Sequence, residues 1–417
     1  MLVGKSYTPP VPVVQGAAKK RALFLILIVM LMDIIGLSIL IPVAPFIVKR
    51  YSSDAFTISM LTGIYAAASF IAAPALGNIS DRVGRRPVLL LSVLGSAIGY
   101  FIFGIGGALW VLFVSRLIDG ITGGNFSTAS AYIADVSTAE DRPKNFAMIG
   151  LAWGLGFVLG PVLSAVTSLI SIDAPAFAAG LLSLASVLLM VFALPESLPK
   201  ERRLTTPLTL GSFNPLISIR DVARKPGMPI LLVVICIFAF VFNGIGSIFS
   251  KFLAERFTVN ATQIATLWVF GGICIALAQS FLVPWTIKRL GETVTAAMSL
   301  VGLGSGSALV AIVPTFAWVY PTFLIRSGLG GFFWAATGSL TASKMQPHEQ
   351  GRLAGVNSAL QNLMAVFGPL AAGAAYDLIT PAAPLFIGLL IMVIGAGVAL
   401  TIRPAPARSG GATAWGG

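Results

Sequence analysis

Asp33 is the residue of this chain that is best placed to carry a proton. It lies eleven residues past Ala22, inside an apolar run that covers residues 22–48, and this is ~17 Å along a helix at 1.5 Å per residue. A charge near the bilayer centre costs ~2.5–3.5 kcal/mol on insertion scales, so this carboxyl group must face a wet cavity or titrate. Proton uptake at Asp33 can then be coupled to another event. The alternative is a structural role, as a hydrogen-bond partner in a helix that Pro42 and Pro45 bend.

Arg116 and Asp119 form a second candidate site for proton chemistry. They are three positions apart in another apolar run, so on a helix they share a face and can form an ion pair. Two readings stay open. Asp119 either neutralises Arg116, or it is a second protonation site whose charge competes for that arginine.

Apolar runs of membrane-spanning length must position these groups. Of the 417 residues, 57% are hydrophobic and 10% are charged, and the mean hydropathy is +0.93, whereas soluble domains carry about 25% charged residues. Only helices satisfy the backbone in spans of this kind, so we expect an all-α polytopic membrane protein. The first span is too long for a cleavable signal peptide and contains Asp33. The expected spans are residues 22–48, 56–77, 87–107, 109–134, 145–167, 175–194, 228–250, 261–286, 292–312, 315–342, 352–376 and 381–402.

Basic residues set the expected orientation. With the N-terminus inside, 21 of the 27 Lys and Arg residues fall on the cytoplasmic side, four fall outside and two lie within spans. This split is a strong positive-inside signal. We therefore expect the chain in the cell (inner) membrane, with both termini on the cytoplasmic side. It also explains the net charge of +12 through membrane lipids as partners, without nucleic acid.

The chain has an internal repeat. Three marks recur in the same order at nearly constant offsets, namely Gly84 with Gly291, Arg116 with Arg326, and Gly160-Pro161 with Gly368-Pro369. Such repeats are common in secondary transporters, whose substrate site lies near the midplane between the halves. The expected organisation is a cytoplasmic tail (1–21), a six-helix bundle (22–194), a cytoplasmic linker (195–227), a second six-helix bundle (228–402) and a cytoplasmic tail (403–417).

Two glycine-containing segments are candidates for moving parts. In the loop between the second and third spans, glycine admits a neighbouring helix, an aspartate can cap a helix N-terminus, and arginines offer partners for acids or lipid phosphates. Two interpretations stay open: the segment is a cytoplasmic latch, or it is a tight turn that only fixes the topology. Its residues are Gly77, Asp81, Arg82, Gly84, Arg85 and Arg86. In the fifth span, Gly156, Gly160 and Pro161 predict close packing and bending.

Polar and aromatic residues inside the spans are candidates for a substrate cavity. Asn357 and Gln361 share a helical face, and the repeat aligns Gln361 with Trp153, so both are expected to look across the centre. An amide beside an aromatic wall suits a planar, amphipathic small molecule. The alternative is that these amides only bond helices together. The expected lining is Trp153, Asn243, Asn357, Gln361 and Arg326, of which Arg326 has no accompanying acid and is also a candidate for a structural or gating role.

These motifs resemble the major facilitator superfamily, and within it the twelve-helix drug:proton antiporters typified by tetracycline exporters. Residues 77–86, GNISDRVGRR, resemble the signature between helices 2 and 3, with Ile79 for the usual Leu. Residues 116–120 resemble the helix 4 signature, and residues 156–161 resemble the antiporter signature of helix 5, although Ser164-Ala165 replaces its closing Gly-Gly. Asp33-x-x-Gly36 resembles the helix 1 pattern of drug exporters. The resemblance covers the whole chain from helix 1 to helix 12.

The resemblance implies a major facilitator fold and proton-coupled efflux of amphipathic compounds or drugs by alternating access. It gives Arg116 a part in proton coupling, and it implies that the cluster between helices 2 and 3 holds the two halves together in one state. Tetracycline exporters carry acids in helices 3 and 9 where this chain has Gly99 and about Leu303. Tetracycline itself is therefore a weaker candidate, and a dedicated exporter of a sugar or another metabolite is the alternative.

Other classes of function are disfavoured. The spans contain no histidine, and Cys236 and Cys274 are isolated, so we expect neither an intramembrane enzyme nor a disulfide. No cofactor and no metal site are expected. The partners are a small-molecule substrate, protons and lipids, and the chain is expected to act as a monomer.

Overall fold

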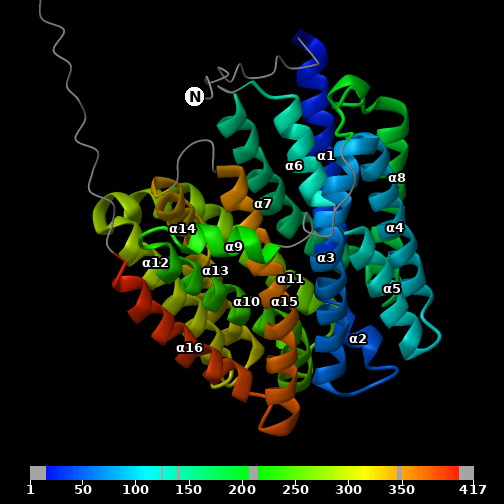
Figure 1. The fold of residues 1–417 in the computed structure, drawn as a ribbon. Coiled ribbons are helices and arrows are strands. Elements are labelled where there is room, and N and C mark those ends of the chain that lie inside the picture. Colours follow the sequence, from blue (N-terminus) through cyan, green and yellow to red (C-terminus); the bar gives the residue numbers. More distant parts are fainter. Residues whose placement is uncertain (1–15, 124, 139–140, 206–214, 345–349, 403–417) are drawn as a thin grey trace, which may run out of the picture.

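A computed structural model describes residues 16–402, except 124, 139–140, 206–214 and 345–349, and every regular element in these ranges is helical. The expected all-α fold is confirmed (Figure 1). The first half holds α1 (Gly16–Ile39), α2 (Ala44–Val48), α3 (Ala55–Val83), α4 (Arg85–Ile105), α5 (Leu109–Thr122), α6 (Asn125–Asp135), α7 (Arg142–Thr167) and α8 (Ala174–Ala193). Helix α9 (Pro215–Ala223) lies in the segment expected to be the linker. The second half holds α10 (Met228–Phe257), α11 (Ala261–Leu277), α12 (Val283–Val310), α13 (Val319–Gly330), α14 (Phe332–Ser343), α15 (Gln350–Leu378) and α16 (Ala383–Leu400).

The helices form twelve membrane crossings. Among the described residues, eight continuous helices are long and apolar enough to span a membrane, and one of them, Ala261–Val310, contains two crossings joined at a turn. The crossings expected at 109–134 and 315–342 are each built from two shorter helices, α5 with α6 and α13 with α14. Helix α15 forms the remaining crossing.

The turn glycines confirm one mark of the repeat. Gly84 ends α3 with φ 117°, and Gly291 breaks α12 with φ 80°. A side chain at such φ values is strained, so both turns favour glycine. The two residues that the alignment places over each other therefore make the same sharp reversal in the two halves.

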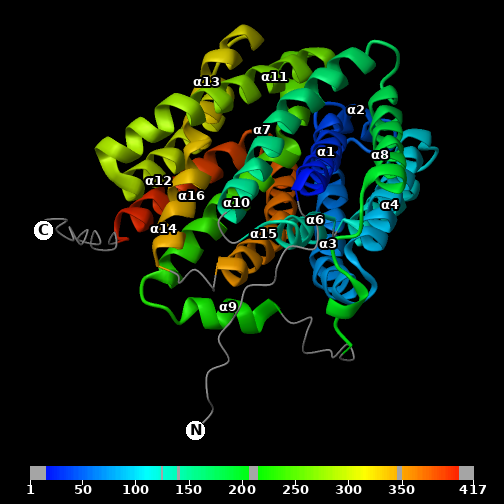
Figure 2. The same ribbon diagram turned by 90° about the horizontal axis from the view of Figure 1, so that it is seen from above.

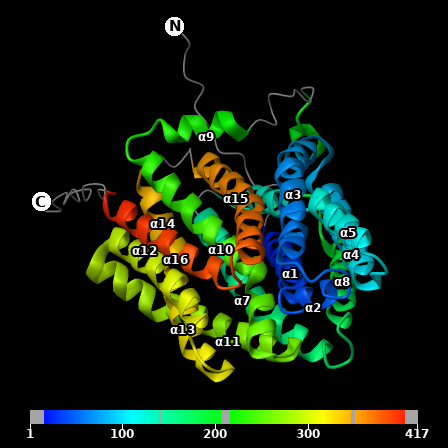
Figure 3. The same ribbon diagram turned by 90° about the horizontal axis from the view of Figure 1, so that it is seen from below.

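Each half packs around its own apolar core. The first bundle has two clusters, one with Ile26 and Tyr132 and the other with Ile39 and Phe103. Among the described residues, the second bundle has one large cluster and a small one with Phe332. The bundles lie side by side in Figure 1, the first in blue to green and the second in green to red. They meet along α3 with α15 (Figure 3) and α7 with α11 (Figure 2). The exact domain boundaries given above stay a prediction.

Polar bonds join the two bundles at one face of the molecule. We call the face where α1, α4, α7 and α10 begin the linker face, and the other the opposite face. At the opposite face, the Asp377 carboxylate accepts hydrogen bonds from the backbone N–H groups of Ala55 (3.0 Å) and Phe56 (2.8 Å) at the start of α3. The Ser250 hydroxyl donates to the Ile41 carbonyl at 3.1 Å. These contacts, the seam bonds, hold the bundles together there.

Close approach of small residues supports the seam. A Cβ atom on Gly373 of α15 would lie 2.5 Å from the Ser59 hydroxyl of α3. One turn away, a Cβ atom on Gly63 would still touch Leu370 at 3.6 Å. Helices of a membrane bundle associate through such small residues because apolar side chains gain little by leaving lipid.

Candidate functional site: an ionisable cluster in the first bundle

Asp33 points into the first bundle. It lies on α1, is partly buried, and is within interaction range of the Asn125 amide of α6 and the Asp119 carboxylate of α5. The neighbouring Gly36 packs on Tyr100 of α4, where an added Cβ would lie 3.2 Å from the ring. The side chain that was predicted from its depth in the first span therefore faces other polar groups of the bundle.

Arg116 and Asp119 form the predicted ion pair. Their closest nitrogen and oxygen atoms are 3.0 Å apart, and the two residues are only 8% and 2% exposed. The Arg116 guanidinium also lies over the rings of Phe103 (4.8 Å) and Tyr100 (5.4 Å). Its Nε and Nη2 atoms are buried without a hydrogen-bond partner among the described residues. The pair is thus desolvated, and the arginine keeps donor capacity that Asp119 does not use.

Two tyrosines of this cluster were missed from the sequence. Tyr65 of α3 and Tyr100 of α4 both lie within electrostatic range of Asp33, Asp119 and Arg116. A tyrosine inside an apolar span carries a hydroxyl that needs a partner, and this signal could have marked them. We call Asp33, Tyr65, Tyr100, Arg116 and Asp119 the ionisable cluster.

Gly99 takes part in the cluster through its lack of a side chain. A Cβ atom at this position would lie 3.0 Å from the Asp119 Cβ and 3.0 Å from the Ser115 carbonyl. The position where tetracycline exporters were expected to carry an acid is therefore occupied by the backbone contact between α4 and α5. An acid there would displace Asp119.

The turn between α3 and α4 bonds to other helices of the first bundle and to the segment that follows α8. Arg85 contacts Asp81 at 2.6 Å and Asp135 of α6 at 3.1 Å, and Arg86 donates to the Met190 carbonyl of α8 at 3.3 Å. A Cβ atom on Gly77 would have only the Ser127 hydroxyl near it, at 3.9 Å. Among the described residues, only this ordinary contact with α6 lies over Gly77. Arg82 donates to the Asn78 carbonyl one turn back on α3.

Glu196, not Asp81, caps the following helix. Asp81 lies in the last turns of α3, whereas the Glu196 carboxylate accepts from the backbone N–H groups of Arg85 (2.9 Å) and Arg86 (3.2 Å) at the start of α4. The expected capping role of Asp81 is wrong because α3 extends to Val83, six residues past the predicted end. Glu196 is far away in the sequence, so only the fold could reveal it.

Helix α7 packs on α1 through its predicted glycines. A Cβ atom on Gly160 would lie 1.9 Å from the Ser38 hydroxyl, and one on Gly156 would lie 2.5 Å from Ile34. The Ser38 hydroxyl donates to the Gly156 carbonyl at 2.9 Å. Close packing at these residues is as expected, and Pro161 lies inside the unbroken α7.

The predicted cavity residues differ in the contacts that they make. Trp153 stacks on Phe157 (centroids 5.6 Å apart) and meets Phe126 edge-on at 5.9 Å. The Asn243 amide donates to the Ala239 carbonyl of its own helix, whereas the Asn357 Oδ1 is buried without a partner among the described residues. Their role as substrate ligands, like that of Gln361, stays a prediction.

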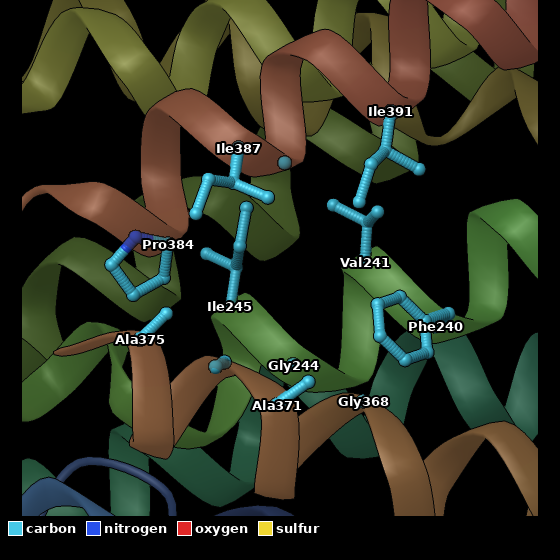
Figure 4. A pocket seen from close by; sticks show the side chains of 12 residues that line it. Phe240, Val241, Gly244, Ile245, Gly368, Ala371, Ala375, Pro384, Ile387 and Ile391 are labelled. Atoms are coloured by element: carbon cyan, nitrogen blue, oxygen red, sulfur yellow. The ribbon is translucent and has the colours of Figure 1, made fainter. Parts of the chain in front are cut away.

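An apolar pocket lies elsewhere, between α10, α15 and α16 (Figure 4). Its cavity volume is only about 50 Å³, and its walls include Phe240, Val241, Ile245 and Ile387. Gly368, which the repeat pairs with Gly160, also lines it. None of the predicted cavity residues does, and the lining carries no side-chain group that could orient a polar ligand.

Sequence comparison relates the chain to known transporters. The profile of the Major Facilitator Superfamily matches residues 26–369 and 250–416. The tetracycline resistance protein, class C, of Escherichia coli is 34% identical over 391 residues, which are 93% of this chain and 97% of that protein. Multidrug resistance protein 2 of Bacillus subtilis (strain 168) is 27% identical over 390 residues, 92% of this chain and 95% of that protein.

Solved structures share the fold. The human organic anion transporter MFSD10 (TETRAN) has a TM-score of 0.69 at 24% identity and matches 92% of this chain and 100% of its own. A variant of the nucleoside transporter NupG has a TM-score of 0.71 at 13% identity and matches 91% of this chain and 98% of its own. At these identities the likeness concerns the arrangement of helices alone.

Proposed function

The chain belongs to the major facilitator superfamily, and on this premise we propose that it exports amphipathic compounds or drugs in exchange for protons. Its relatives directly support a multi-pass membrane transporter of small molecules. The proton-driven step rests on one observation, which is that Asp33 lies within interaction range of a buried Arg116–Asp119 pair.

Charge balance explains how the ionisable cluster can respond to a proton. With Asp33 and Asp119 ionised and Arg116 positive, the cluster carries one net negative charge inside the bundle. A single proton on either carboxyl group makes it neutral, which removes the desolvation cost of that charge. Protonation therefore favours a conformation that closes around the cluster, and deprotonation favours one that hydrates it.

Alternating access then follows from unequal stability of two states. In our proposal the linker face is cytoplasmic, and the seam bonds close the opposite, external face. Substrate enters from the cytoplasm when Asp33 is deprotonated, the bundles rock about the central region, and an external proton resets the transporter. Substrate and proton shift this equilibrium only through different affinities for the two states.

The names of the relatives guide the proposed substrate. They are resistance proteins for tetracycline and for multiple drugs, so planar, amphipathic compounds are the first to test. The adjacent rings of Trp153, Phe157 and Phe126 support this class, because an aromatic wall binds planar molecules with little polar discrimination. A resistance panel with a single positive compound would favour the metabolite exporter instead.

Proton coupling at Asp33 is tested by pH-driven efflux. Inverted membrane vesicles that contain Asp33→Asn should lose substrate uptake driven by an imposed pH gradient, by at least tenfold, because an amide cannot exchange a proton. Substrate exchange without a gradient should persist. Asp54→Asn, on the exposed loop before α3, is the matched control and should behave like the parent. Parent-like, gradient-driven transport by Asp33→Asn would overturn the coupling assignment.

A further inference from the structure

Arg326 is a deeply buried cation whose hydrogen bonds are mostly unused. It lies on α13, seven residues after Val319, and is 4% exposed, which places it about 10 Å along the helix from the opposite face. Its Nε donates to the Ser307 hydroxyl at 3.1 Å. The two terminal nitrogens have no hydrogen-bond acceptor in the described part of the chain.

Three aromatic rings surround this guanidinium. Its central carbon lies 4.7 Å from the ring centroid of Phe249, 5.1 Å from that of Phe323 and 5.5 Å from that of Trp268. Rings at these distances stabilise a desolvated cation through the negative charge of their faces. They provide no oxygen atom, so the in-plane N–H groups keep their capacity to bind an anion. We call Arg326 and these three rings the arginine box.

No described acidic residue of the second bundle neutralises the box. Glu255 is engaged by Lys251 and by the Tyr376 hydroxyl. Asp377 caps α3, and Glu292 accepts from the Ser339 hydroxyl. The remaining acid, Glu349, lies outside the described residues.

The repeat makes this absence informative. The equivalent arginine of the first bundle, Arg116, also lies over aromatic rings but is paired with Asp119 at 3.0 Å. A buried charge without a partner is costly. In the first bundle the Asp119 carboxylate neutralises Arg116, whereas the described part of the second bundle provides no carboxylate for Arg326.

We infer that the arginine box is a binding subsite for a planar monoanionic group, such as the carboxylate of an aromatic acid. A carboxylate matches the fork of two N–H groups on a guanidinium and forms bidentate, charge-assisted hydrogen bonds with it. The adjacent rings would contact the planar body of the same ligand. That this ligand is a transported substrate rests on the proposed function, whereas its binding does not.

The seam bonds give the box a route of access. The Trp268 indole N–H donates to the Ser250 hydroxyl at 3.3 Å, and the Ser250 hydroxyl donates to the Ile41 carbonyl of the first bundle. One wall of the box is thus tied to the contact that holds the bundles together at the opposite face. When the bundles separate there, Ser250 loses its acceptor in the first bundle, and Trp268 stays bonded only within its own bundle. We expect the subsite to open toward that face.

Binding of benzoate to the purified full-length protein in nanodiscs tests the site. Benzoate should raise the unfolding temperature of the parent and alter its tryptophan fluorescence, and Trp268→Phe should remove the fluorescence change but retain the thermal shift. Arg326→Gln should weaken benzoate binding at least tenfold. The matched control is Arg256→Gln, which removes an exposed arginine from the same end of the second bundle and should bind like the parent.

Further controls distinguish binding of a carboxylate from binding of a neutral ring or of any anion. Another variant covers the case in which Arg326→Gln does not fold. Benzamide, the neutral isostere, should not bind, and chloride at the same concentration should not compete. Arg326→Lys keeps the charge without the fork, so it should bind benzoate less tightly than the parent even if Arg326→Gln does not fold. Unchanged affinity in either variant, binding of benzamide equal to that of benzoate, or equal competition by chloride would each overturn the assignment.

The outcome is distinguishable from failure of the proposed function. Proton coupling is measured by gradient-driven efflux of the Asp33 variant, and the anion subsite is measured by the benzoate affinity of the purified protein. Benzoate binding that Arg326→Gln loses and Asp33→Asn keeps supports the arginine box whatever the efflux of either variant. Loss of gradient-driven efflux in the Asp33 variant leaves benzoate binding untouched.

Discussion

At the scale of single residues, Asp119 has the largest structural consequence. It is 2% exposed and forms the ion pair of Arg116, whose other donors are already without partners among the described residues. Removing one member of a buried pair leaves an uncompensated charge, which costs about 3–5 kcal/mol. Asp119 is therefore a structural requirement whether or not it also carries a proton.

This argument predicts the behaviour of two variants. Asp119→Asn should lower the free energy of unfolding by about 3–5 kcal/mol because Arg116 stays charged and loses its partner. The double variant Arg116→Gln/Asp119→Asn should recover most of that loss. Denaturant unfolding in detergent measures both.

Efflux by the double variant then separates the two readings of Asp119. Recovery of pH-driven efflux along with stability would show that Asp119 only neutralises Arg116. Recovery of stability without efflux would make Asp119 a second protonation site. An Asp119→Asn protein as stable as the parent would contradict the buried pair itself.

At the scale of helices, α1 and α7 approach each other so closely at two glycines that any added side chain would collide with α1. A methyl group at Gly160 would fall within 1.9 Å of the Ser38 hydroxyl, whereas one at Gly154, on the same helix, would meet nothing within 4 Å. The two positions form a natural pair for comparison, since both lie inside α7.

Gly160→Ala should therefore destabilise the protein by about 1–3 kcal/mol, because the two helices must move apart. Gly154→Ala should be neutral or stabilising by up to about 1 kcal/mol, because alanine favours a helix interior. Thermal unfolding of both variants in the same detergent provides the measurement. Equal effects of the two substitutions would show that α1 does not approach α7 as closely as described.

Much of the helical order could be predicted from the sequence, for physical reasons. Spans are dictated by the thickness of the bilayer, and the turns at Gly84 and Gly291 require a residue without a side chain. The division of two crossings into α5 with α6 and α13 with α14 was not predicted, because hydropathy does not register a break in a helix. The cap by Glu196 and the inclusion of Tyr65 and Tyr100 depend on which helices are neighbours, and a single sequence does not show that.

At the scale of the whole molecule, we expect the seam bonds to influence the balance between the two orientations of the bundles that the proposed function requires. The Asp377 carboxylate accepts two backbone N–H groups of α3, and bonds of this charge-assisted kind contribute about 1.5–3 kcal/mol each. They exist only while the bundles meet at the opposite face. Their loss should therefore favour the state in which that face is open.

Asp377→Ala should increase the exposure of residues buried in the seam. Ser59 is fully buried there, so a Ser59→Cys reporter, in a background with Cys236 and Cys274 replaced by serine, measures opening through its reaction with an impermeant thiol reagent. The labelling rate should rise about tenfold or more, since ~1.4 kcal/mol corresponds to a factor of ten. The matched control is Asp173→Asn, which removes a carboxylate bonded to Arg50 within one bundle. The same rate in all three proteins would contradict the gating role of Asp377.

The contact of Ser38 with Gly156 and Gly160 also constrains how Asp33 can move. Ser38 lies five positions after Asp33 on α1. The close contact of the two helices there restricts movement of α1 along α7. Helix α7 in turn lies against α11 of the second bundle, where a Cβ on Gly272 would meet Val158 at 2.6 Å. Asp33, the proposed proton carrier, thus lies on a helix that is packed tightly on α7, and α7 in turn contacts the other half of the protein. A tilt of the second bundle would then reach Asp33 as a displacement of its whole helix, without any rearrangement of side chains in between.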